Sequence, residues 1–305
     1  MEERLERLLT ECRSYTKEGK LADYIPELSK ANPDHLGICL VGNGGKMASA
    51  GDDQVQFTIQ SIIKPVLLLQ ALLDNGVEAV RAKVGVEATG KPFDAINVTD
   101  QKLARGNLNP MVNMGAIVMC TLIQGESFEA RFRRVLELTR LLADNPTLSL
   151  DEAVYRSEKR TGSKNRALAY LLKSSGDLEG DVEEVLYCYF RACSIRVTCR
   201  DLARIGSVLA GHGTAPNGET PLFPPEYATY VNAVLMTCGM YDGSGDFAVR
   251  VGVPAKSGVG GGIMAVVPSR MGIGIYAPSL DAKGNSVAGI HLLERLSQKL
   301  ELSIF

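Results

Sequence analysis

The sequence is poor in residues that build metal and disulfide sites. It has no tryptophan, only three histidines, and seven cysteines of which no two form a C-x-x-C pair. An odd number of cysteines in a chain of 305 residues argues against a disulfide framework, and the histidines do not pair at metal-ligand spacing. We therefore expect most cysteines to be small buried apolar residues, and we expect neither a metal nor another cofactor.

The chain also lacks a marked charge of either sign and any long apolar run. Lysine and arginine number 33 against 35 aspartates and glutamates, and no long basic run occurs. A near-neutral chain has no general reason to bind nucleic acid or an anionic membrane. No stretch is long and apolar enough for a transmembrane helix, and the charged N-terminus does not resemble a secretory signal. We expect a cytoplasmic protein with no nucleic-acid or membrane partner.

Apolar spacing predicts the elements of the first quarter of the chain. Residues 2–18 repeat apolar side chains at helical spacing, and an apolar helix is expected over 65–76. Residues 36–42 are typical of a buried strand. The glycine-rich turn at 43–45 and the run 46–52 complete a predicted β-hairpin.

The middle of the chain, up to about residue 235, is predicted to be mainly helical. The sequence SLDE at 149–152 matches a capping box with Ser149 as the N-cap and Glu152 reaching back, and Gly162 suits the end of that helix. The sequence TCRD at 198–201 repeats the capping pattern before another apolar run.

After residue 244 the pattern changes from helical to β-rich. Short apolar runs at 246–258, 262–270 and 271–278 are separated by turn residues, and residues 284–302 form an amphipathic helical pattern. Strands near both ends around a helical block predict an α/β region combined with an all-α region. We expect one antiparallel sheet flanked by helices, with an inserted helical subdomain.

The chain is thus predicted to be one catalytic unit over residues 1–305 with two subdomains. The sheet region comprises about 1–64 plus 236–305, and the helical region about 65–235. Ser61 lies where the first passes into the second, and clefts between such regions are favoured ligand sites.

Ser61 and Lys64 stand three residues apart at the start of the apolar helix. At this spacing two helical side chains share a face, so lysine could activate serine as a nucleophile. The lysine would have to be neutral, which requires its usual pKa of about 10.4 to fall by roughly 3 units. Pro65 places Ser61 near the helix start, where its free N–H could donate to an oxyanion. The alternative is a capping serine beside a surface lysine.

A second motif, Lys256-Ser257-Gly258, follows in the β-rich end of the chain. An early S-x-x-K with a late K-[ST]-G is the pairing of serine β-lactamases and penicillin-binding proteins. Alone, the late motif could be a plain strand end before a glycine-rich turn. The S-D-N motif of those enzymes is absent, which argues against β-lactam chemistry.

Longer strings resemble one relative of that fold, the serine-dependent glutaminases, in their compact bacterial form. These strings are YIPELSKANPDHLGI, QSIIKP, NPMVNMGAI, SEKRTGSKN, CGMYDGSG and PAKSGVGGGI, at 24–38, 60–65, 109–117, 157–165, 238–245 and 254–263. The resemblance implies a β-lactamase/transpeptidase-like fold. It also implies L-glutamine amidohydrolase activity, which releases L-glutamate and ammonia.

The resemblance also implies catalytic roles. Ser61 matches the nucleophile, Lys64 the general base of a Ser-Lys dyad, and Tyr241 a tyrosine that relays the proton to ammonia. Val259 matches the residue whose backbone N–H joins that of Ser61 in the oxyanion hole. Either Lys64 or Tyr241 could carry each proton transfer.

Substrate-binding roles follow in the same way. Glu158 matches the residue that faces the substrate ammonium, and Asn113 and Asn165 match asparagines that bind its polar ends. Without the resemblance, Glu158 would be taken for part of a solvated helix face and Asn165 for a helix cap.

Three further residues complete the expected binding site. Tyr24 and Tyr189 match pocket-lining tyrosines, and Gln60 precedes the nucleophile as in the family. The resemblance also implies a homodimer or homotetramer. The polarity of segment 98–109 suggests a mobile loop. The competing functions are a β-lactamase- or peptidase-like acyl transferase and a non-catalytic amino-acid-binding protein.

Overall fold

The structure is a computed structural model that describes residues 1–88 and 108–305. The expected loop at 98–109 therefore lies largely outside the described residues. Within the described ranges, five strands form one antiparallel sheet in the order β2-β1-β7-β6-β5. Their bounds are β1 Gly37–Gly42, β2 Met47–Gly51, β5 Ala255–Ser257, β6 Gly262–Val267 and β7 Met271–Tyr276.

The two ends of the chain meet in the middle of this sheet. Strand β1 pairs with β7 along its whole length, with Leu40 opposite Ile273. The prediction that the terminal strands form one sheet is thereby confirmed. Strands that alternate buried side chains between two faces require cover on both sides, and the helices supply it.

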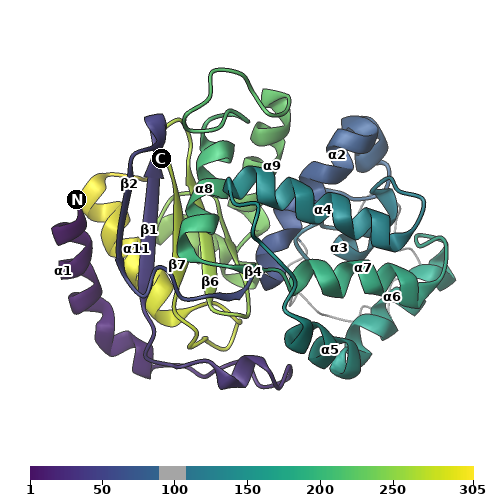
Figure 1. The fold of residues 1–305 in the computed structure, drawn as a ribbon, viewed down its shortest axis with the longest axis horizontal. Coiled ribbons are helices and arrows are strands. Elements are labelled where there is room, and N and C mark those ends of the chain that lie inside the picture. Colours follow the sequence, from purple (N-terminus) through teal and green to yellow (C-terminus); the bar gives the residue numbers. More distant parts are fainter. Residues whose placement is uncertain (89–107) are drawn as a thin grey trace.

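Helices α1 (Glu2–Cys12) and α11 (Val287–Leu300) cover one face of the sheet, as Figure 1 shows. They bury Leu5, Leu8 and Leu292 against the strands. Helix α8 (Cys199–Ala210) lies on the other face. A side chain at Gly274 would come within 2.0 Å of the carbonyl oxygen of Cys199, so the close approach of α8 to β7 depends on glycine there.

The remaining helices, apart from α10, gather on the far side of α8, on the right of Figure 1. They bury a second apolar core that extends to the sheet. The bounds are α2 Lys64–Arg81, α3 Asn113–Leu122, α4 Phe128–Ala143, α5 Glu152–Thr161, α6 Ser163–Ser175, α7 Val182–Cys193, α9 Pro225–Cys238 and α10 Ser244–Arg250. The helical middle block is as predicted, and the subdomain boundaries at 64/65 and 235/236 stay a prediction.

Short elements connect these layers. Strands β3 (Phe57–Thr58) and β4 (Arg196–Val197) pair in a small separate sheet. Five 3-10 turns complete the described structure: η1 Arg13–Lys17, η2 Leu28–Lys30, η3 Asn43–Gly45, η4 Gln60–Ile63 and η5 Tyr241–Gly243. Accordingly, the predicted helix 2–18 becomes α1 followed by η1. The helix expected over 65–76 is interrupted at Gly76, as its predicted end requires, and α2 resumes after this kink to Arg81.

The predicted capping box at 149–152 is wrong. Asp151 caps α5, and its side chain accepts the N–H of Val154. The carbonyl of Ser149 instead accepts the N–H of Arg196, and Leu150 bridges Ile195. This long-range pairing holds Ser149 extended before the helix starts. The box at 198–201 is confirmed, with Thr198 and Asp201 bonded reciprocally.

The predicted β-rich run 246–258 is half wrong. Residues Ser244–Arg250 form helix α10, and only Ala255–Ser257 form a strand. The alternation of Phe247, Val249 and Val251 resembles a strand, but Val249 is exposed while Phe247 is buried against α11 and the sheet. Tertiary packing thus decides the conformation of this segment.

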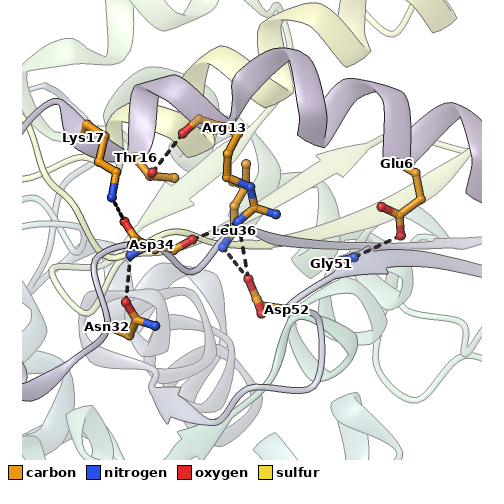
Figure 2. A network of polar contacts seen from close by, with 9 residues as sticks. All are labelled: Glu6, Arg13, Thr16, Lys17, Asn32, Asp34, Leu36, Gly51 and Asp52. Atoms are coloured by element: carbon orange, nitrogen blue, oxygen red, sulfur yellow. Dashed lines mark hydrogen bonds and ion pairs between the residues drawn. The ribbon is translucent and has the colours of Figure 1, made fainter.

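Polar contacts fasten the N-terminal helix to the hairpin, as Figure 2 shows. The guanidinium of Arg13 donates to the carbonyl of Asp34 at 2.8 Å, and the N–H of Leu36 donates to the carboxylate of Asp52 at 2.8 Å. Lys17 pairs with the Asp34 carboxylate. These contacts fix both ends of the segment 18–35, which contains Tyr24.

One further property concerns membranes. Over the described ranges, no helix combines the length and the apolar character needed to cross a bilayer.

Candidate active site

A pocket brings most of the predicted site residues together. All of them except Lys64 and Tyr241 line it. The complete lining is Tyr24, Ile25, Gln60, Ser61, Asn113, Glu158, Thr161, Gly162, Lys164, Asn165, Tyr189, Cys193 and Val259. The lining comes from both the sheet side and the helical side, as expected for a cleft at their junction.

Ser61 lies in the 3-10 turn η4 that leads into α2. Pro65 occupies the first turn of α2, as predicted, where a missing N–H costs no helical hydrogen bond. The preceding residue, Gln60, has φ of +49°, a left-handed conformation that non-glycine residues rarely adopt. This bend turns the chain from β3 into the helix and leaves Ser61 in the pocket wall.

Val259 reaches the same wall from the turn between β5 and β6. That turn packs closely on the segment before Ser61: a side chain at Gly258 would lie 2.9 Å from the carbonyl oxygen of Ile59, and one at Gly260 would lie 2.7 Å from that of Thr58. Within the described ranges, neither the N–H of Ser61 nor that of Val259 donates a backbone hydrogen bond. Two free donors therefore border one pocket.

Lys64 is fully buried behind this wall. Its amine donates to Oδ1 of Asn113 at 2.7 Å and to the carbonyl of Met111 at 3.3 Å. Asn113, the first residue of α3, also accepts the Tyr189 hydroxyl at 3.2 Å and donates to Asn165 at 2.9 Å. The surface-lysine alternative for Lys64 is therefore wrong, because the amine is in the polar interior of the site.

Glu158 presents a buried carboxylate to the pocket. Its Oε2 has no hydrogen-bond partner in the described part of the chain. Burial raises the pKa of this carboxyl to about 8, and the charge of Lys64 opposes the shift. An unpaired buried carboxylate is costly unless a cation joins it, so this group can bind a ligand ammonium.

Tyr241 lies next to the pocket. It packs in a small apolar cluster with Val259, Ala22 and Leu280. Its hydroxyl donates to the carbonyl of Ser257 at 3.2 Å, and its φ is +56°. The tyrosine is thus fixed against the turn that carries one of the two free donors.

Five pocket residues were not predicted from the sequence, although helical spacing could have indicated two of them. Thr161 lies three residues after Glu158 on α5, and Cys193 four after Tyr189 on α7. Gly162 and Lys164 stand inside the quoted string 157–165, and Ile25 follows Tyr24. Asn165, interpreted as a helix cap without the resemblance, lies within α6 instead.

Metal ligands do not gather in the described part of the chain. There, no group of three or more His, Cys, Asp or Glu side chains could hold a metal ion.

Comparison with known proteins gives a consistent result. A sequence model of the family described as Glutaminase matches residues 19–305. A glutaminase of Clostridium tetani is 52% identical over 305 residues, covering 100% of both chains. Glutaminase 2 of Clostridium perfringens is 52% identical over 302 residues and covers 99% of both chains.

Solved structures that are similar to this chain are also glutaminases. A probable glutaminase from Bacillus subtilis complexed with 6-diazo-5-oxo-L-norleucine has a TM-score of 0.91 at 40% identity, with 100% of this chain and 97% of that chain covered. A covalent complex of the B. subtilis glutaminase with 5-oxo-L-norleucine also gives 0.91, at 39% identity, covering 100% and 99%. The predicted fold class is confirmed.

Proposed function

The chain belongs to the glutaminase family and hydrolyses L-glutamine to L-glutamate and ammonia, and from this premise we propose that it does so through an acyl-enzyme on Ser61. The observation that carries the proposal is the meeting, in one pocket, of Ser61, the free N–H of Val259 and the unpaired carboxylate of Glu158. A nucleophile, an oxyanion donor and a counter-charge for the substrate are what amide hydrolysis of an amino acid requires.

In the first step, Lys64 takes the proton of the Ser61 hydroxyl while its oxygen attacks the amide carbon of glutamine. The carbonyl oxygen becomes an oxyanion, which accepts the N–H groups of Ser61 and Val259. When the tetrahedral intermediate collapses, the carbon–nitrogen bond breaks and the departing nitrogen takes a proton from Tyr241. An ester on Ser61 and one molecule of ammonia result.

In the second step, water attacks the ester carbon and gives up a proton to the basic groups of the site. The bond to Ser61 breaks, its oxygen regains a proton, and glutamate leaves. Tyr241, left as a phenolate by the first step, takes the proton of water, and protonated Lys64 returns its proton to Ser61. If Lys64 first reprotonates the phenolate, neutral Lys64 takes the proton of water and returns it to Ser61 instead. Lys64 must be neutral to act as a base, and repulsion from the nearby Lys256 disfavours charge on both lysines.

The remaining residues of the pocket wall bind the two ends of the substrate. The substrate ammonium pairs with Glu158, which favours the ionised carboxylate against the burial that raises its pKa. Asn113 and Asn165 hydrogen-bond the polar ends of glutamine, and Tyr24, Tyr189 and Gln60 complete the enclosure. Tyr24 is 53% exposed, which suits a residue at the pocket entrance.

We propose a cytoplasmic homodimer or homotetramer with the two subdomains given above, on the family resemblance. Light scattering of the purified protein tests the assembly state: a monomer at micromolar concentration would contradict it. Partner residues do not enter the proposed chemistry.

The test of the mechanism is to measure ammonia release from glutamine by Ser61→Ala, with asparagine as the comparison substrate. We expect activity to be abolished and the melting temperature to be retained. Intact mass after 6-diazo-5-oxo-L-norleucine treatment should show one adduct, located at Ser61 by peptide mapping. The matched control is Ser174→Ala on the exposed face of α6, which should behave as wild type.

The same experiment separates the alternatives. Substantial residual activity of Ser61→Ala, or an adduct on another residue, would overturn the acyl-enzyme. Labelling of Ser61 by a penicillin would support an acyl transferase of the β-lactamase type. Glutamine binding by calorimetry without product would indicate a binding protein.

A further inference from the structure

Lys256 is a second fully buried lysine, and the reaction scheme above leaves it without a positional role. It lies in the middle of β5, opposite Met264 on β6, on the strand that leads directly to Val259. A lysine is almost never fully buried unless its amine is paired, so its contacts require an explanation.

The amine of Lys256 has three partners. It donates to the carbonyl of Gly239 at 2.9 Å and to that of Ser257 at 2.7 Å. Its nitrogen also lies 4.2 Å from the centroid of the Tyr241 ring. A protonated amine carries three N–H groups, and these partners are two carbonyls and the ring face, where a cation is attracted.

Those partners surround Tyr241 on both sides. Gly239, the C-cap of α9, lies two residues before it, and Ser257 accepts both the amine of Lys256 and the hydroxyl of Tyr241. The tyrosine itself has φ of +56°, which persists only where the surroundings impose it. The lysine therefore bridges the chain before the tyrosine, its ring and the acceptor of its hydroxyl.

We propose that Lys256 is a positioning residue for Tyr241. Through the carbonyls of Gly239 and Ser257 and the ring face, it holds the tyrosine in its left-handed backbone conformation and so orients the phenol. This inference rests on the proposed role of Tyr241 as proton carrier. It gives the Lys-Ser-Gly sequence a function: the lysine orients the tyrosine, and the turn after it supplies the N–H of Val259.

The charges around the amine act in opposite directions. Burial, and then the charge of Lys64, lower the pKa of Lys256 well below its ordinary value, and Cys238 on α9 raises it. The carbonyl end of α9 and the Tyr241 ring favour the charged form. A neutral amine retains two N–H groups for the two carbonyls, so the positioning holds in both protonation states.

A double-mutant cycle tests the inference. We expect Lys256→Met to lower kcat roughly 10- to 100-fold, because a displacement of about 1 Å in a reacting group costs about 100-fold. KM and L-glutamate binding by calorimetry should change little. In the Tyr241→Phe background, Lys256→Met should add less than threefold, because its effect passes through the phenol hydroxyl.

A pH profile adds a readout that a purely structural role would not move. Lys64 and Lys256 repel each other when both are charged. Removing Lys256 should therefore shift the acid limb of kcat/KM to higher pH, because Lys64 then keeps its proton longer. The control is Lys173→Met, an exposed lysine that also donates to a backbone carbonyl, which should leave activity and profile unchanged.

The outcomes are distinguishable. Multiplicative losses in the double mutant would overturn the role of Lys256 and leave the proposed mechanism intact. A Tyr241→Phe variant with wild-type activity would overturn the proton-carrier role and this inference with it, whereas the adduct on Ser61 tests the acyl-enzyme separately. If Lys256→Met fails to fold, Lys256→Gln, which keeps a donor, is measured in the same cycle.

Discussion

The amine of Lys64 lies 2.7 Å from the side-chain oxygen of Asn113, with both residues buried. The same oxygen accepts the Tyr189 hydroxyl, and the amide nitrogen donates to Asn165. One side-chain amide thus joins the proposed base to two walls of the substrate pocket. An amide oxygen is a neutral acceptor, so it orients the lysine without adding a negative charge that would stabilise its protonated form.

Asn113→Asp replaces that neutral oxygen by a carboxylate of the same shape. A negative charge at 2.7 Å stabilises protonated Lys64 and should raise its pKa by about a unit or more. We expect the acid limb of kcat/KM to move to higher pH and activity at pH 7 to fall at least roughly 10-fold.

Asn165→Asp serves as the comparison for that variant, because Asn165 accepts a hydrogen bond from Asn113, the residue that itself accepts one from Lys64. It should raise KM with little movement of the acid limb. Equal displacement of the limb in both variants would contradict a specific link between Asn113 and Lys64. Profiles of kcat/KM from pH 5 to 10 provide the measurement.

Glu158→Gln should stabilise the free protein while impairing it as an enzyme. In the folded chain, burial raises the pKa of this carboxyl from its ordinary 4.5 to about 8. Between those values the folded state holds a proton that the unfolded state has lost, so Glu158 lowers stability progressively as pH rises through the window. Glutamine cannot ionise, and the variant should escape this loss.

Thermal melts from pH 4.5 to 9 check the effect. The melting temperature of Glu158→Gln should exceed that of wild type by a margin that grows up to about pH 8 and is constant above it. In parallel, kcat/KM should fall about 10- to 150-fold, since a hydrogen bond to a charged group contributes about 1.5–3 kcal/mol. A margin independent of pH would show that the carboxyl is not buried in solution.

Much of the fold followed from local patterns. The strand runs at 36–42, 262–270 and 271–278 were assigned correctly because alternation and turn residues are local signals. The box at 198–201 was also correct, whereas that at 149–152 was overridden by the pairing of Leu150 with Ile195, which no local pattern contains. Helix α10 was missed because the packing of Phe247 against α11 and the sheet, which no local pattern contains, sets its conformation.

Sequence motifs and the family resemblance predicted which residues belong to the site, but not their contacts or their burial. The spacing of Ser61 and Lys64 suggested a dyad, but no local pattern indicated that Lys64 also donates to Asn113, 49 residues away on another helix. Glu158 looked like part of a solvated face because Arg156, Lys159 and Arg160 flank it, but its own side of α5 faces the pocket. Which face a short helix buries is set by its neighbours.

Thr198→Ala should lower stability without changing catalysis. Thr198 caps α8, which covers the inner face of the sheet, and its side chain accepts the N–H of Asp201. Loss of such a cap costs about 1 kcal/mol, which corresponds to a fall of about 2 °C in melting temperature for a chain of this size. Activity at 25 °C should be unchanged, because α8 contributes no residue to the pocket lining.

The control for that variant is Thr10→Ala. The hydroxyl of Thr10 donates to the carbonyl of Glu6 on the exposed side of α1 and caps nothing. Its melting temperature should stay within about 1 °C of wild type, since surface substitutions usually stay within about 0.5 kcal/mol. Equal losses in the two variants would mean that the box contributes nothing beyond an ordinary surface threonine.

Gly260→Ala should impair the chemical step more than the fold. The added carbon would lie 2.7 Å from the carbonyl oxygen of Thr58 and would push the turn that carries Val259 away from Ser61. Losing the alignment of one oxyanion donor costs about 100- to 1,000-fold in kcat, and a partial shift should cost roughly 10- to 100-fold.

Gly245→Ala is the matched control, because a side chain there meets nothing within 4 Å. Steady-state kinetics with glutamine should show kcat falling in Gly260→Ala alone, with KM and the melting temperature close to wild type. A variant that loses affinity instead would place the turn in substrate binding rather than in oxyanion stabilisation.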